Sequence, residues 1–295
     1  MSDHALPQDT VIAPQARKAQ ARRTSVGAIA KYLLVTFFAF LMAMPFIWMM
    51  STSLKTDLEA LNFPPSLVPE APVWENYPNA WTAQPFARAY FNSVYIAVVV
   101  TVVQTFTSAL AAYAFARINF FGKNLIFLAF LATMMVPFQV TLIPRFLMFR
   151  DLGWMNTHLP LIVPAALANA FSIFLIRQFI MSLPVELEEA AAIDGASRLR
   201  IFWQIILPLT KPALAASAIF AFLGQWNSFL APLIFLNSPD LFTVPLLLNA
   251  FRGLYTTSWP LVMAASVISV IPVLIVYSVF QKYFIQGIAL SGLKG

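Results

Sequence analysis

The chain contains no cysteine and only two histidines, His4 and His158, among its 295 residues. Without cysteine, a disulfide framework and thiolate chemistry are excluded, and two distant histidines cannot supply the ligand spacing of a metal site. The adjacent carboxylates Glu188 and Glu189 would point to different faces of a helix, so they are poorly placed for paired acid–base catalysis. We therefore expect no catalytic site, no metal site and no enzyme activity in this chain.

Charged residues are also scarce. They make up 10% of the chain, whereas about a quarter is usual in soluble domains. Hydrophobic residues make up 60%, and the mean hydropathy is +0.77. The apolar residues are grouped in blocks long enough to cross a hydrocarbon core of about 30 Å as helices. The composition therefore indicates a membrane protein.

Six blocks qualify as transmembrane helices, and none of them contains Asp, Glu, Lys, Arg or His. The expected fold class is all-α, a polytopic membrane protein with six transmembrane helices. Thirteen of the 18 Lys and Arg residues fall in inner segments if both termini are cytoplasmic, so the positive-inside rule predicts an N-in, C-in orientation. The expected spans are 32–53, 92–116, 125–143, 159–176, 213–236 and 260–280.

Residues 1–27 precede the first span and include a basic run from Arg17 to Arg23. We expect a disordered, basic cytoplasmic leader that rests near anionic lipid headgroups, followed by a transmembrane domain over 28–295. A cleaved signal peptide is not expected, because the following apolar block is too long and no small-residue cleavage site closes it. The net charge of +6 is explained by cytoplasmic flanks, so nucleic acid is not an expected partner.

The connections between the spans differ in length and composition. The outer segment 54–91 is rich in proline, which favours an extended strap over a continuous helix. Gly122 is expected at a positive φ in the short turn after the second span. Pro144 is expected to interrupt the third span, and Thr157 is a candidate cap for the fourth.

The inner connection 182–208 is the most polar stretch near the membrane. Glutamates near its start suit a helix N-terminus, Gly195 stands where a glycine would adopt a positive φ, and Ser197 can cap a second helix that Pro208 would end. The pattern predicts a helix, a glycine turn and a second helix. Such an element could dock another protein, or it could be an amphipathic linker that lies on the membrane.

Resemblance to a known family distinguishes these alternatives. Glu189-Ala190-Ala191, Gly195, Ile205 and Leu207-Pro208 resemble, at every anchor and gap, the "EAA" signature of permeases of ATP-binding cassette (ABC) importers. The resemblance implies a type I ABC importer permease fold in which 182–208 is a coupling element held in a cleft of the ATPase subunit. The implied ATPase-coupling residues are Glu189, Ala190, Ala191, Asp194, Gly195, Ile205, Leu207 and Pro208.

The last ten residues, 286–295, are similar to the C-terminus of carbohydrate permeases, in particular the maltose-type second subunit. Trp226-Asn227, the stretch 76–81 and Asn156-Thr157 are also similar to that group, and the resemblance covers about 31–295. Arg145 departs from the pattern, since an apolar residue is expected after Pro144. In that group the tail reaches the interface between the two ATPase subunits, which implies contacts from Gly287, Gly292, Lys294 and Gly295; a frayed terminus is the alternative.

No energy source is evident in the chain itself. Ion-coupled carriers place ionisable side chains inside their spans, and none is found there. A phosphate-binding loop is also missing, because Arg117 stands where the first glycine before Gly122-Lys123 would be needed. The resemblance therefore implies that ATP and Mg²⁺ bind in two partner ATPase subunits and that this chain holds no cofactor. It further implies a second homologous permease subunit, an extracytoplasmic solute-binding protein and a bacterial inner membrane.

Polar residues in the fifth span could line a path for sugar. Trp226 and Asn227 are the expected path-lining residues. Interhelical hydrogen bonding is the favoured interpretation of the other polar residues of the spans, which are Gln225 and Ser228 in the fifth span, Gln104, Thr105 and Ser108 in the second, and the single amides Gln139 and Asn169. The expected function is translocation of a sugar or sugar derivative delivered by the binding protein. Two alternatives remain: an ABC permease for a non-sugar solute such as polyamine or phosphate, and a stand-alone secondary carrier.

Overall fold

The computed structural model describes residues 14–251 and 258–292, and the regular structure within them is entirely helical. The first half of the chain holds α1 (Pro14–Ser53), α2 (Asp57–Ala60), α3 (Asn76–Thr82), α4 (Phe86–Arg117), α5 (Lys123–Ala132), η1 (Thr133–Met135), η2 (Phe138–Thr141) and α6 (Leu142–Asp151). The second half holds α7 (Leu159–Ala166), α8 (Ala170–Met181), α9 (Glu186–Ile193), α10 (Arg198–Ile201), η3 (Phe202–Ile206), α11 (Leu207–Leu209), α12 (Lys211–Trp226), α13 (Leu230–Phe235), η4 (Pro239–Leu241), α14 (Val244–Ala250) and α15 (Trp259–Gly292).

The expected set of membrane spans is confirmed in outline. Four stretches are long and apolar enough to cross a membrane, and two bent helix pairs raise the number to six. The four single stretches are Gly27–Ser53, Phe86–Arg117, Leu159–Met181 and Trp259–Lys282, of which Leu159–Met181 comprises α7 and α8 with a short break between them. The all-α, polytopic fold class is therefore correct.

Helix α1 begins earlier than expected. Residues 14–27 were predicted to be a disordered leader, but the helix starts at Pro14 and continues without a break to Ser53. Alanine, arginine, lysine and glutamine are strong helix formers, and proline is tolerated in a first helical turn. Residues 1–13, the rest of the expected leader, lie outside the described residues.

The third span is interrupted, but not at Pro144. The segments 123–135 and 138–151 meet at an angle of 94°. Pro137 causes this break, because it lacks an amide N–H and forces the preceding Val136 into an extended conformation (φ −86°, ψ 110°). Pro144 lies in the first turn of α6, where no intrahelical bond from its nitrogen is needed, so the expectation of a break there was wrong.

The fifth span also differs from the expected range 213–236. Helix α12 ends at Trp226, and a separate short helix, α13, follows after residues 227–229. At its N-terminal end, α12 meets the segment 198–209 at an angle of 77°. Pro208 lies inside α11, so the second inner helix ends one residue later than predicted, and the chain bends at Thr210.

The proline-rich segment 54–91 is only partly an extended strap. It contains α2 and α3, and the chain enters α4 at Phe86. The buried Asn76 side chain donates hydrogen bonds to the carbonyl oxygens of Ser53 (3.0 Å) and Lys55 (2.8 Å). These bonds fix the start of α3 against the end of α1.

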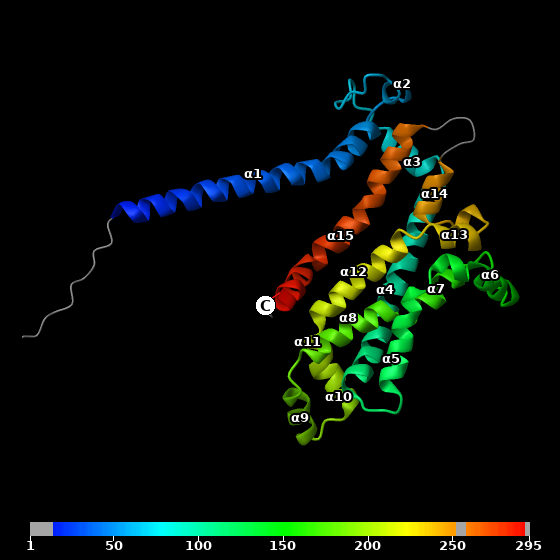
Figure 1. Cartoon of the computed structure of the whole chain (residues 1–295). Helices are drawn as coiled ribbons and strands as arrows, with labels where there is room; N and C mark the ends of the chain where they lie inside the picture. The colour runs from blue at the N-terminus through cyan, green and yellow to red at the C-terminus, as the bar shows by residue number, and fades with distance from the viewer. Residues whose placement is uncertain (1–13, 252–257, 293–295) are drawn as a thin grey trace, which may run out of the picture.

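Helix α4 lies at the centre of the bundle and packs against α7, α8 and α12, while α15 packs against α12 and α1 (Figure 1). Helices α9 and α10 lie at one end of the bundle, which we call the α9 end. Helices α2, α3 and α14 lie at the opposite end, the α3 end (Figure 1). Helix α1 projects away from this body, and over residues 27–53, where its side chains are described, the buried residues are Ser51 to Ser53 in its last turn. Most of its apolar surface is left uncovered by this chain.

Candidate functional site

The inner connection 182–208 has the predicted form of a helix, a glycine turn and a second helix. Glu186, Glu188 and Glu189 occupy the first turn of α9, where they complement the helix dipole. Gly195 has φ +81°, a value that side chains other than glycine rarely adopt. The Ser197 hydroxyl accepts the N–H of Arg200 and so caps α10.

One face of this element is exposed and mixed in character. Glu189, Ala190, Asp194 and Gly195 are all exposed, and Ile193 is 87% exposed. A carboxylate rim around an uncovered isoleucine and small alanine suits close approach by another protein. Ala191 behaves differently, because it packs against the hydrophobic cluster at the α9 end. The geometry thus brings most, but not all, of the first part of the signature to one surface.

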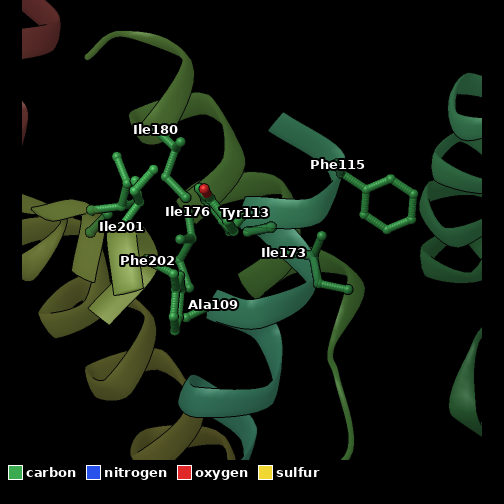
Figure 2. Packing of buried hydrophobic residues seen from close by; sticks show 11 residues of the cluster. Ala109, Tyr113, Phe115, Ile173, Ile176, Ile180, Ile201 and Phe202 are labelled. Carbon is green, nitrogen blue, oxygen red and sulfur yellow. The ribbon is translucent and has the colours of Figure 1, made fainter. Parts of the chain in front are cut away.

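The second part of the signature is largely structural. Ile205 and Leu207 are half-buried and pack against the same cluster, while Pro208 is exposed. This cluster joins α4, α8 and the segment 198–206, and Figure 2 shows Tyr113 and Phe202 meeting at its centre. Their rings lie 5.3 Å apart between centroids. The apolar anchors of the signature therefore attach the element to the transmembrane helices.

Glu188 forms an attachment that the sequence did not reveal. Its side chain is 9% exposed and accepts a hydrogen bond from Arg117 Nε at 2.5 Å, within an ion pair. Its other oxygen accepts the Tyr113 hydroxyl at 3.2 Å. Arg117 also donates to the carbonyl oxygens of Ile180 and Leu183, at 2.9 and 2.8 Å. The last turn of α4 is thus bonded both to α9 and to the chain that leads into it.

The expected tail contacts are only partly placed. Gly287 and Gly292 fall within α15, whose last residue is Gly292. Lys294 and Gly295 lie outside the described residues. The role of the tail therefore stays a prediction.

Trp226 does not have the surroundings expected of a residue that lines a path. It is 3% exposed, stacks on Phe222 (centroids 5.8 Å apart) and donates its indole N–H to the Ser269 carbonyl at 3.2 Å. Asn227, in contrast, is exposed at the C-terminal cap of α12. Elsewhere Gln104 bonds to Ser172 across α4 and α8, which is the interhelical role that was considered for such polar residues.

A cavity of about 310 Å³ lies where three helical segments break. Arg145 reaches it from the first turns of α6, Asn169 from the break between α7 and α8, and Gln225 and Ser228 from the end of α12. Phe138 and other apolar residues form the remaining wall. The amides and Ser228 stand out singly in the sequence, but nothing in the sequence groups them with Arg145.

Comparison with known proteins identifies the family. The family described as "Binding-protein-dependent transport system inner membrane component" matches residues 104–290. This range is more than half of the chain and contains α9, the glycine turn and α12. This chain belongs to that family. It is therefore an inner membrane component of an ABC transporter, as the signature predicted.

The similarity extends over nearly the whole permease. This chain is 35% identical to an arabinooligosaccharide transport system permease of Halalkalibacterium halodurans, over 88% of this chain and 94% of that protein. It is 38% identical to a trehalose/maltose transport system permease of Thermococcus litoralis, over 90% of this chain and 98% of that protein. Among solved structures, a bacterial ABC transporter involved in import of the acidic polysaccharide alginate has a chain with TM-score 0.78 and 27% identity, covering 89% of this chain and 98% of that one. The permease fold is thus confirmed.

Proposed function

We propose that this permease is one of two membrane subunits of an ATP-driven importer that moves a saccharide delivered by an extracytoplasmic binding protein. The observation that carries the proposal is the exposed surface formed by Glu189, Ala190 and Ile193 to Gly195, which we call the α9 surface. It is bonded to the central helix α4 through Glu188 and Arg117. A docking site joined in this way can pass movement of a partner to the spans. The family match supports the dependence on a binding protein.

ATP hydrolysis is assigned to partner subunits. The sequence has no phosphate-binding loop, and the groups of three or more His, Cys, Asp and Glu that could hold a metal are absent from the described residues. In this proposal ATP and Mg²⁺ bind in two ATPase subunits, which grip the α9 surface. Glu189, Ala190, Asp194 and Gly195 contact them, and the C-terminal tail approaches the interface between them.

The uncovered apolar surface of helix α1 supports a second permease subunit. The most apolar 18 residues within its stretch Gly27–Ser53 have a mean hydropathy of 2.2, yet none of them is buried within this chain. A related subunit that packs against α1 would cover the face that α15 leaves open. With both termini on the cytoplasmic side, as the positive-inside rule predicts, the α9 end faces the ATPases and the α3 end faces the binding protein.

Relatives support a saccharide cargo without specifying one. Two are permeases for arabinooligosaccharides and for trehalose or maltose, and the solved relative serves an acidic polysaccharide. No relative reported above supports a polyamine or phosphate cargo, or a carrier that works alone.

The proposal is tested by co-purification and uptake. A tagged full-length permease is expected to retain its partner ATPase, and Ile193→Asp should lose it, because the change places a charge at Ile193, which is 87% exposed at the centre of the α9 surface. Val68→Asp is the matched control, since Val68 is 74% exposed at the α3 end. Uptake of radiolabelled saccharide into proteoliposomes should require ATP, the ATPase and the binding protein. Uptake driven by an ion gradient in the permease alone would contradict the proposal, as would ATPase retention by Ile193→Asp.

A further inference from the structure

The cavity of about 310 Å³ bounded by α6, α7 and α12 has a composition that apolar packing does not explain. It lies beside broken helices, and in membrane proteins irregular backbone at such depth is tolerated where it is buried in protein or lines a polar path. Asn169, Gln225 and Ser228 each bring a hydrogen-bonding side chain to it. Three breaks converging on one polar cavity indicate a place where solute passes.

Arg145 gives this cavity its charge. Among the described residues that line it, Arg145 is the one ionisable side chain. Its guanidinium lies 5.2 Å from the centroid of the Phe138 ring, and no carboxylate in the described part of the chain lies within ion-pair distance. The other arginine of this helix, Arg150, is paired with Asp151 at 2.8 Å. A half-buried guanidinium with five donors and no acidic neighbour is suited to a carboxylate or sulfonate.

The backbone adds a second contribution of the same sign. Helix α8, of 12 residues, begins at the cavity, and its N-terminal cap is Asn169, which lines the cavity. The positive end of a helix dipole favours a negative charge within about one turn. The Asn169 side-chain oxygen accepts the Ser172 N–H as the cap, so its NH₂ group and the Gln225 amide remain to bond sugar hydroxyls. The Phe138 ring offers an apolar face to sugar C–H groups.

We propose that this cavity is an anion-accepting subsite of the transport path, in which Arg145 holds the acid group of an acidic saccharide. This inference rests on the proposed function, because it names the class of its cargo. It also explains why a cation follows Pro144, where an apolar residue was expected. An anionic lipid headgroup has the same chemistry, so the test must separate the two sources.

The absence of cysteine makes a direct test possible, because one introduced thiol is the only one in the chain. In the assembled importer, with cysteine-free partner subunits, Ser228→Cys is labelled with anionic methanethiosulfonate ethylsulfonate or with cationic methanethiosulfonate ethyltrimethylammonium. The labelling rate of each reagent is divided by its rate of reaction with a small thiol in solution, which corrects for the intrinsic reactivity of the two reagents. The anionic reagent should be favoured, and adding Arg145→Gln should lower the anion-to-cation ratio by about tenfold, since one removed charge acts oppositely on the two reagents. Arg150→Gln is the matched control and should leave the ratio unchanged.

Protection identifies the occupant. Digalacturonate should slow labelling of Ser228→Cys more than the neutral disaccharide cellobiose does, and only while Arg145 is present. An unchanged ratio in Arg145→Gln, or equal protection by both disaccharides, would overturn the inference. Slower labelling in phosphatidylglycerol vesicles than in phosphatidylcholine vesicles, with no effect of digalacturonate, would assign the subsite to lipid and would also overturn it. The proposed function is judged separately, since ATP-dependent uptake of a neutral saccharide would sustain it in either case.

Discussion

Replacing Glu188 with glutamine removes the charge that holds α9 against the end of α4, while the size of the side chain is kept. The carboxylate receives Arg117 Nε and the Tyr113 hydroxyl, and the Arg117 and Glu188 side chains are 13% and 9% exposed. After the substitution, Arg117 keeps its bonds to the carbonyl oxygens of Ile180 and Leu183 but has no counter-charge. A mostly buried guanidinium is then left uncompensated.

The magnitude follows from this burial. Removing one partner of a buried ion pair costs about 3–5 kcal/mol, because the remaining charge stays out of water. Glutamine can still accept a hydrogen bond from Tyr113, and both groups retain a little solvent contact, so the low end of the range, about 3 kcal/mol, is expected. Since each 1.4 kcal/mol corresponds to a factor of ten, local opening of α9 should become roughly 100-fold more frequent.

Hydrogen–deuterium exchange of the purified permease measures this opening. Amides of residues 188–194 should exchange roughly 100-fold faster in Glu188→Gln, whereas those in the middle of α4 should be unaffected. Glu189→Gln is the matched control, because Glu189 lies next in the chain and is exposed. The double variant Arg117→Gln with Glu188→Gln should recover part of the protection, since no buried charge is then unpaired. Equal exchange in Glu188→Gln and Glu189→Gln would refute the reasoning.

Three further predictions concern single residues. Gly195→Val should lower ATP-coupled uptake and destabilise the turn by about 1–2 kcal/mol, because the φ of Gly195 is +81° even though no atom lies within 4 Å of the added Cβ. Gly224→Val is the control in both uptake and thermal unfolding, because Gly224 is equally open but has no positive φ. Trp226→Phe should cost about 1 kcal/mol in thermal unfolding through the lost bond to Ser269, without a change in which saccharides are carried; an altered uptake profile would restore Trp226 to the transport path. Ser197→Ala should lower the stability of α10 by about 1 kcal/mol and speed its amide exchange, and unchanged exchange would show that the cap contributes nothing.

The sequence predicted the elements whose cause is local. Long apolar blocks gave the number of spans, and glycine and serine at fixed positions gave the turn at Gly195 and the cap at Ser197. Gly122 likewise has a positive φ of 74°. The Thr157 hydroxyl accepts the N–H of Leu159 at 3.3 Å, although the capping position itself is His158. These features depend on a few adjacent residues, so a pattern is enough to reveal them.

Features that depend on distant segments could not be predicted in this way. The pair Arg117–Glu188 joins residues that two spans separate along the sequence, and nothing near either residue points to the other. Trp226 was expected to line the path because it stands in a polar cluster, but its burial is decided by α15, which supplies the Ser269 carbonyl. The break in the third span was expected at Pro144, and Pro137 was not considered as a breaker inside the expected span 125–143. Pro144 is harmless because it lies in the first turn of α6, a position that depends on the break at Pro137 before it.

Helix α4 is attached at both ends, which makes it the route by which movement at α9 could reach the opposite end of the permease. Its 32 residues span about 48 Å. At the α3 end the Asn92 amide donates to the carbonyl oxygens of Asp240 and Phe242, at 2.9 and 3.0 Å, and Asn92 is only 6% exposed. Asn92→Leu leaves two carbonyl oxygens without this donor and should cost about 1–3 kcal/mol in thermal unfolding. It should also lower uptake while the ATPase remains bound, because only the far attachment is lost.

The neighbouring ion pair provides the control for that prediction. Arg88 contacts Asp240 at 3.3 Å, but both side chains are 64% exposed, so Arg88→Gln should cost well under about 1 kcal/mol and leave uptake intact. If α4 transmits the movement, uptake should depend on the buried Asn92 amide and not on the exposed Arg88 charge, even though both groups contact Asp240 of η4. Equal effects of the two substitutions on uptake would mean that η4 acts through its surface charge, and unchanged uptake in Asn92→Leu would show that movement reaches the α3 end by a route other than α4.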